Sequence, residues 1–92
     1  MKISEIKKGM KIKGDDGRLG IVTEVRDGEC FFARPTEKPY VSDQVVQGVG
    51  TVKLIMATPF YPAEGGRFKG YWADGKLNSE VVAEVIDEGS NA

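Results

Sequence analysis

The fold is decided by one stretch of the first half, which reads Arg18-Leu19-Gly20-Ile21-Val22-Thr23-Glu24-Val25-Arg26-Asp27-Gly28-Glu29-Cys30-Phe31-Phe32-Ala33. Before the Asp-Gly pair, residues that would face one side of a strand alternate in polarity with residues that would face the other side, as they do in a half-buried strand. Asp-Gly is the favoured pair for a two-residue type I′ hairpin turn, because both central positions need positive φ. The stretch therefore predicts a β-hairpin in which Arg26 opposes Glu29.

Counting outward from this turn sets the register and the core. Val25 then opposes Cys30 and Thr23 opposes Phe32, while Val22 opposes Ala33 on the other face. The residues predicted to point into the core are Leu19, Ile21, Val25, Cys30 and Phe32. In this arrangement Cys30 is a small buried hydrophobe rather than a reactive thiol, because nothing near it in the sequence clearly lowers its pKa.

Further short strands are expected on both sides of the hairpin. Residues 10–13 alternate Met10 and Ile12 with lysines, and the cluster Gly14-Asp15-Asp16-Gly17 is a turn rather than a calcium loop, since the ligand spacing of an EF-hand is missing. Pro35 and Pro39 bracket a loop. Residues 40–47 are ambiguous, residues 48–50 form a turn, residues 51–57 form a largely buried strand, and residues 58–66 form a loop.

The next strand spans residues 67–73 and reaches a second Asp-Gly turn at Asp74-Gly75. That turn places Trp72 opposite Leu77, with Phe68 on the same inward face. Residues 78–88 remain open between two structures. Asn78 or Ser79 could cap a helix with one apolar stripe, but the many β-branched residues favour a strand by a small margin.

Composition points to one small domain. The 92 residues are 40% hydrophobic and 29% charged, and twelve glycines are spread among short β-branched and aromatic runs. This pattern predicts a mainly β chain, folded as a small, antiparallel, strongly bent β-barrel or roll with at most one short helix. We expect the domain to occupy residues 1–88 and residues 89–92 to be a short flexible tail.

Several classes of function are disfavoured by what the sequence lacks. It has no histidine and a single cysteine, so a transition-metal site and His-based catalysis have no support, and no phosphate-binding loop or nucleophile elbow is present. We therefore expect a protein that is not an enzyme and has no cofactor. No apolar run is long enough to span a bilayer and the start lacks the apolar stretch of a signal peptide, so the expected compartment is the cytoplasm.

Charge and aromatic residues indicate where a partner would bind. The net charge is −1, yet lysines crowd the N-terminal end, among them Lys11 and Lys13. A second cluster mixes aromatic and cationic residues between positions 60 and 72. If Phe68 and Trp72 face inward, alternation exposes the opposite side of that strand. The predicted binding residues are Tyr61, Arg67, Lys69 and Tyr71, with Lys53 extending the strip if its strand is a neighbour, and with Lys11 and Lys13.

The run Lys8-Gly9-Met10-Lys11-Ile12-Lys13-Gly14, followed by Gly17-Arg18-Leu19-Gly20-Ile21-Val22-Thr23-Glu24-Val25, resembles the opening of KOW and related Src-homology-3-like barrels. In those families a lysine- and glycine-rich strand leads into a Gly-x-Val-type strand. The resemblance implies several short, bent antiparallel strands, and its families bind nucleic acid, ribosomal or transcription components, or peptides. We therefore expect a module that binds a protein or peptide, with a KOW-like nucleic-acid accessory protein as the alternative.

Overall fold

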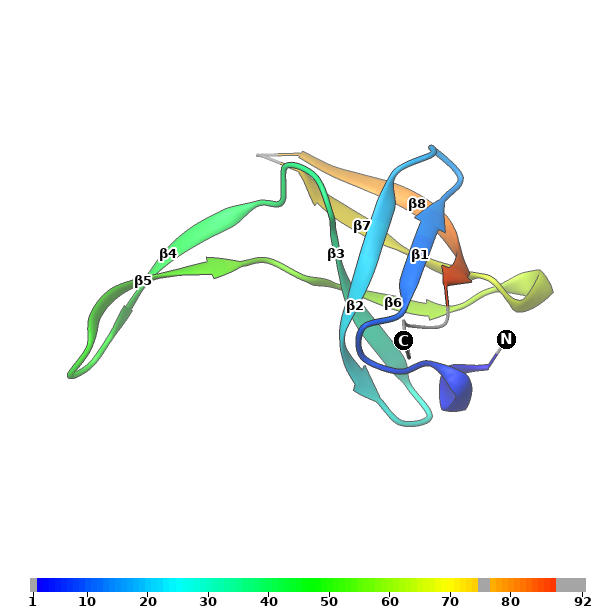
Figure 1. The fold of residues 1–92 in the computed structure, drawn as a ribbon, viewed down its shortest axis with the longest axis horizontal. Coiled ribbons are helices and arrows are strands. Elements are labelled where there is room, and N and C mark those ends of the chain that lie inside the picture. Colours follow the sequence, from blue (N-terminus) through cyan, green and yellow to red (C-terminus); the bar gives the residue numbers. More distant parts are fainter. Residues whose placement is uncertain (1, 75–76, 88–92) are drawn as a thin grey trace.

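The computed structural model describes residues 2–74 and 77–87, and shows a closed antiparallel β-barrel with a long arm (Figure 1). The strands of the barrel, in their order around it, are β1 (Lys11–Gly14), β2 (Leu19–Arg26), β3 (Cys30–Pro35), β6 (Thr58–Pro62), β7 (Phe68–Asp74) and β8 (Leu77–Asp87). The helical turns among the described residues are two short 3-10 turns, Ile3–Glu5 and Glu64–Gly66. The predicted mainly β barrel is confirmed, and so is a strand rather than a helix after residue 77. The expected tail at residues 89–92 lies outside the described residues.

Four aromatic side chains form the centre of the core. Phe31, Phe60, Phe68 and Trp72 are all fully buried. The Phe31 ring stacks on Phe60 with centroids 5.4 Å apart and meets Phe68 edge-on at 4.9 Å, while Phe60 lies 5.2 Å from Trp72. Such ring pairs each contribute about 0.5–1.5 kcal/mol beyond their buried area. The predicted inward direction of Phe68 and Trp72 is confirmed.

Smaller side chains complete the core from the remaining strands. Ile12 of β1, Val22 of β2 and Val81 of β8 are buried in the same cluster, as are Ile3 and Ile6 from the segment before β1. Met10 also belongs to it, so the predicted apolar side of residues 10–13 is confirmed. The N-terminal segment is therefore part of the barrel's packing.

The register of the β2–β3 hairpin differs from the prediction. Arg26 pairs with Cys30 rather than Glu29, and Val25 pairs with Phe31. Of the turn residues only Gly28 has positive φ, at 78°, so the turn is not type I′ and the loop holds three residues. A bulge between Val22 and Glu24 returns the ladder to the expected Val22–Ala33 pair.

This shift changes which residues of the hairpin face the core. Phe31 and Val22 are buried, whereas Leu19 is exposed and Ile21 and Phe32 are half-buried, so the predicted core face was wrong at these three positions. Val25 packs against the core, as predicted. Phe32 turns outward, with the Arg26 guanidinium 4.8 Å above its ring. Cys30 is buried, as expected, and is a free thiol.

Two other local expectations were also wrong. Trp72 pairs with Ser79 rather than Leu77, since the β7–β8 ladder ends at Asp74–Leu77, and the expected turn residue Gly75 lies outside the described residues. The expected loop at residues 58–66 contains strand β6. Proline removes a donor from a ladder, but Pro59 and Pro62 lie near the two ends of this short strand, and β6 still pairs on both sides.

The arm is a β-hairpin of β4 (Val41–Val46) and β5 (Gly50–Ile55), and with its root residues it spans residues 40–56. It projects from the barrel between β3 and β6, and the molecule measures 44 × 27 × 26 Å (Figure 1). The radius of gyration is 13.7 Å, against about 12 Å for a compact chain of this length. The predicted strand after residue 50 exists, but the expectation that it is largely buried was wrong, because it pairs with β4 away from the core.

Candidate functional site

Three predicted binding residues gather on the outer face of β6 and β7. Tyr61 pairs across the ladder with Lys69, while Tyr71, two residues along β7, lies in the next row. All three are exposed, with 53% of Tyr61 and 48% of Tyr71 accessible. Their exposure follows from strand alternation, since the intervening Gly70 and the flanking Phe68 and Trp72 face inward.

Glu80 of β8 completes this face and was not among the predicted residues. It stands directly across the ladder from Tyr71. Its Oε1 lies 3.3 Å from Lys69 Nζ, and its Oε2 accepts a hydrogen bond of 3.3 Å from the Tyr71 hydroxyl. One carboxylate thus joins both side chains and neutralises the lysine. The strand that the sequence favours for residues 78–88 places Glu80 on the same face as Glu84, by alternation.

The same side chains line a shallow hollow of about 490 Å³, which we call the groove. Its lining includes Pro59, Tyr61, Lys69, Gly70, Tyr71 and Glu80. Gly70 lets the strands lie close at this point, since a Cβ there would lie 2.6 Å from the Pro59 carbonyl oxygen and 2.7 Å from the Phe60 ring. The groove is therefore lined by a tyrosine from each of two neighbouring strands, together with Pro59.

Arg67 and Lys13 lie apart from the groove. Both line a smaller hollow of about 230 Å³ between β1, β8 and the residue before β7. Asp15 and Glu84 line the same hollow, so acids accompany both cations. Lys11 is exposed on β1 opposite Ile21. Arg67 thus does not lie in one strip with Lys69 and Tyr71.

Lys53 lies on the arm, because β5 pairs with β4 and not with a barrel strand. Its Nζ is 2.8 Å from an Asp43 carboxylate oxygen. The condition under which Lys53 would extend the strip is therefore not met.

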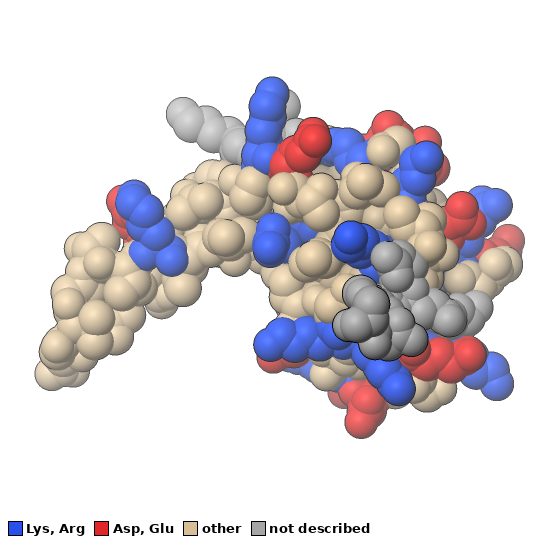
Figure 2. All heavy atoms as spheres, viewed as in Figure 1, with Lys and Arg blue, Asp and Glu red and all other residues tan. Residues whose placement is uncertain are grey.

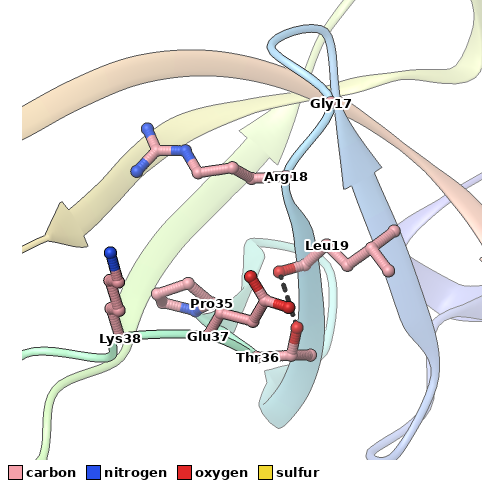
Figure 3. Close-up of a pocket in the computed structure, with 7 residues that line it drawn as sticks. All are labelled: Gly17, Arg18, Leu19, Pro35, Thr36, Glu37 and Lys38. Carbon is pink, nitrogen blue, oxygen red and sulfur yellow. Dashed lines mark hydrogen bonds between the residues drawn. The ribbon is translucent and has the colours of Figure 1, made fainter.

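A third hollow, of about 390 Å³, lies where the arm leaves the barrel (Figure 3). The carbonyl of Leu19 accepts a hydrogen bond of 3.0 Å from the Thr36 backbone N–H and one of 3.5 Å from the Thr36 hydroxyl, which is the dashed line in Figure 3. The Leu19 side chain points away from the hollow. Arg18 and Lys38 extend toward the same side of it. These contacts fix the chain after β3 against the start of β2.

No protein-family model, characterised protein or solved structure matches the chain. Among the residues that the structure describes, no helix is long and apolar enough to span a membrane. Within residues 2–74 and 77–87, no three His, Cys, Asp or Glu side chains come together as a metal site would require.

Asp16, in the turn between β1 and β2, has the clearest electrostatic perturbation. Burial raises the pKa of its carboxyl. Hydrogen bonds from the Arg18 backbone and guanidinium, together with the positive charge of Arg18, lower the pKa by more than burial raises it. The nearby indole N–H of Trp72 acts in the same direction. The net pKa lies below the ordinary value of 3.8, so the carboxylate is a fixed anion at neutral pH.

Proposed function

We propose that this chain is a Src-homology-3-like β-barrel module that binds an extended, proline-rich peptide segment of a protein partner in the groove. The observation that carries the proposal is the pair of half-exposed tyrosines, Tyr61 and Tyr71, over a hollow of about 490 Å³. That volume lies in the range of about 300–1,000 Å³ typical of ligand sites.

Aromatic residues on rigid strands suit this class of ligand. A tyrosine offers a large contact area with few rotatable bonds, and the groove's tyrosines lie on hydrogen-bonded barrel strands rather than loops. Proline-rich segments dock in aromatic-lined grooves because their extended helix is already formed and little entropy is lost on binding. Pro59, which also lines the groove, offers an apolar contact to such a ligand.

Charge separates this proposal from the KOW-like nucleic-acid alternative. Binding to phosphates needs cations whose charge is free to replace counterions. Lys69 is paired with Glu80, and the hollow that Arg67 and Lys13 line also contains Asp15 and Glu84. The groove therefore favours an uncharged peptide over a polyanion.

Nuclear magnetic resonance titration tests the proposal with two probes, a short proline-rich peptide and a short single-stranded oligothymidylate. We expect the peptide to shift the backbone amide signals of Tyr61, Lys69, Tyr71 and Glu80, and the oligonucleotide to leave them unchanged. Tyr61→Ala and Tyr71→Ala should each weaken peptide binding. Tyr40→Ala is the matched control, since Tyr40 is an exposed tyrosine on the arm, outside the groove.

Two results would contradict the proposal. One is an absence of groove shifts with the peptide. The other is tight oligothymidylate binding that weakens steeply with salt and shifts the signals of Lys11, Lys13 and Arg67, which would select the nucleic-acid alternative.

A further inference from the structure

A further hollow adjoins the groove where β6 ends. It measures about 630 Å³ and we call it the N-terminal hollow. Its lining includes three residues of the N-terminal segment, one of the β2–β3 loop and two at the end of β6, namely Lys2, Ser4, Glu5, Gly28, Pro62 and Ala63. Pro62 and Ala63 also line the groove. The two hollows are therefore neighbours that share one short stretch of chain.

The lining of the groove extends furthest along β6. It reaches from Pro59 through Tyr61 and Pro62 to Ala63, whose backbone is still extended, with φ of −130° and ψ of −179°. The steps from Pro59 to Ala63 cover about 13 Å at about 3.3 Å per residue. A polyproline helix rises about 3.1 Å per residue, so about five of its residues fill this length. A longer ligand that follows β6 then reaches the N-terminal hollow.

The chemistry of the N-terminal hollow differs from that of the groove. Its described lining holds no aromatic side chain. Ser4 is exposed, and its hydroxyl has no hydrogen-bond partner within the described part of the chain, so it can donate to a ligand and accept from one. The Glu5 carboxylate accepts a hydrogen bond of 2.8 Å from the Lys2 backbone N–H. Charged side chains of both signs surround this turn (Figure 2), so the hollow suits a polar chain.

We infer that the partner segment has two parts, a proline-rich part in the groove and a polar flank that continues over Pro62 and Ala63 into the N-terminal hollow. This inference rests on the proposed function, because the groove supplies the first part of the site. Once the proline-rich part is bound, the flank is already held beside the second hollow. Its contacts with Ser4 then add affinity without a second loss of translational freedom.

Three synthetic peptides test the inference. The first is a proline-rich peptide of about five residues, the length that the groove accommodates. The other two carry the same sequence extended by serine and glutamine residues, one at the amino end and one at the carboxyl end. In nuclear magnetic resonance titrations, we expect the short peptide to shift the amide signals of Tyr61 and Tyr71 only. One extended peptide should also shift Ser4 and Gly28, and should bind about tenfold more tightly by calorimetry.

A bulky residue in the N-terminal hollow should remove this gain. Ser4→Trp fills the hollow, so it should abolish the advantage of the extended peptide and leave the affinity of the short peptide unchanged. Unchanged binding of the short peptide also shows that the variant is folded. The matched control is Lys8→Trp, which places the same side chain at an exposed position of the same segment outside the hollow, and should retain the gain.

The outcomes separate failure of the inference from failure of the proposed function. If no peptide shifts Tyr61 and Tyr71, the proposed function fails and the inference fails with it. If the short peptide binds in the groove and neither extension binds more tightly or shifts Ser4 and Gly28, only the inference is overturned. This measurement uses the wild-type protein and does not depend on the folding of any variant. A gain that persists in Ser4→Trp, or that Lys8→Trp removes, also overturns the inference.

Discussion

Gly20 of β2 lies directly against the indole ring of Trp72 of β7, across the interior of the barrel. A Cβ added at Gly20 would lie 2.9 Å from Cζ3 of the ring and closer still to Cη2, with the Arg34 carbonyl oxygen 3.0 Å away on its other side. Trp72 is fully buried. Because Gly20 has no side chain, it leaves room for the Trp72 ring, which is the largest side chain of the core.

Gly20→Ala should destabilise the barrel by about 1–3 kcal/mol, the usual cost of forcing extra volume into a packed core. Urea unfolding followed by circular dichroism measures the change in all the variants, including those without Trp72, the single tryptophan of the chain. The control is the double variant Gly20→Ala with Trp72→Phe, in which the smaller ring makes room for the methyl group. Its loss of stability should be less than the sum of the two single losses, and strict additivity would show that the two residues do not compete for space.

Gly28→Val should destabilise the protein by about 1 kcal/mol or more, because a β-branched residue is strained at positive φ. Gly28 has φ of 78°, and a Cβ there would meet no atom within 4 Å, so the cost comes from the backbone alone. Gly28→Asn is the matched control and should cost less, since asparagine tolerates this region. Equal melting temperatures for the two variants would exclude backbone strain as the cause.

Acid should remove a contribution to stability that Asp16 makes. Its pKa is lower in the folded protein than its ordinary value of 3.8, so the ionised form stabilises the fold. That contribution is complete above the unfolded value and is lost as the pH falls through the folded pKa. Asp16→Asn should therefore be less stable than wild type at neutral pH, and the difference should shrink in acid. A difference in urea midpoint that stays constant with pH would contradict this assignment.

Removal of the arm should leave the barrel folded. Ala33 of β3 pairs with Thr58 of β6, so the two strands are already neighbours and a short Gly-Ser linker can replace residues 38–56. The free energy of unfolding should change by no more than about 1 kcal/mol, since loop length affects closure entropy only slowly. Phe60→Ala, which cuts into the core, is the contrast and should cost about 3–5 kcal/mol. Loss of near-ultraviolet circular dichroism on removal of the arm would show that the barrel depends on it.

Much of the barrel could be predicted from local chemistry, while the inward face of the β2–β3 hairpin could not. Alternation placed Phe68 and Trp72 inward correctly because β7 runs without a bulge. In β2 the bulge beside Thr23 and the three-residue loop at Gly28 each shift the count by one, and neither is marked by the residue pattern. The Trp72 ring also needs the inward-facing Gly20 beside it. The alternation of apolar residues in this strand instead assigns position 20 to the outward face.

The candidate site was predictable in its tyrosines but not in its charge. Lys69 and Tyr71 follow from alternation beside buried aromatics, whereas Tyr61 lies in a segment that the sequence predicts as a loop. Glu80 joins them only through the β7–β8 register. Arg67 was grouped with them by parity, but it precedes β7 and lines another hollow. The exposure of the arm had no local signal, because its β-branched residues are those of a buried strand.

The order of strands around the barrel sets how the chain closes on itself. Within the described residues, each barrel ladder joins strands that follow one another along the chain once the arm between β3 and β6 is set aside, apart from the seam between β1 and β8, where Ile12 pairs with Val85. The other ladders join residues that lie closer together in the sequence, but the seam brings together almost the whole length of the chain, so we expect it to be the slowest contact to form. Until it forms, β1 and β8 are open edges that can pair with other molecules. We therefore expect the seam to form last in folding and to be the point at which an incomplete chain is most prone to aggregate.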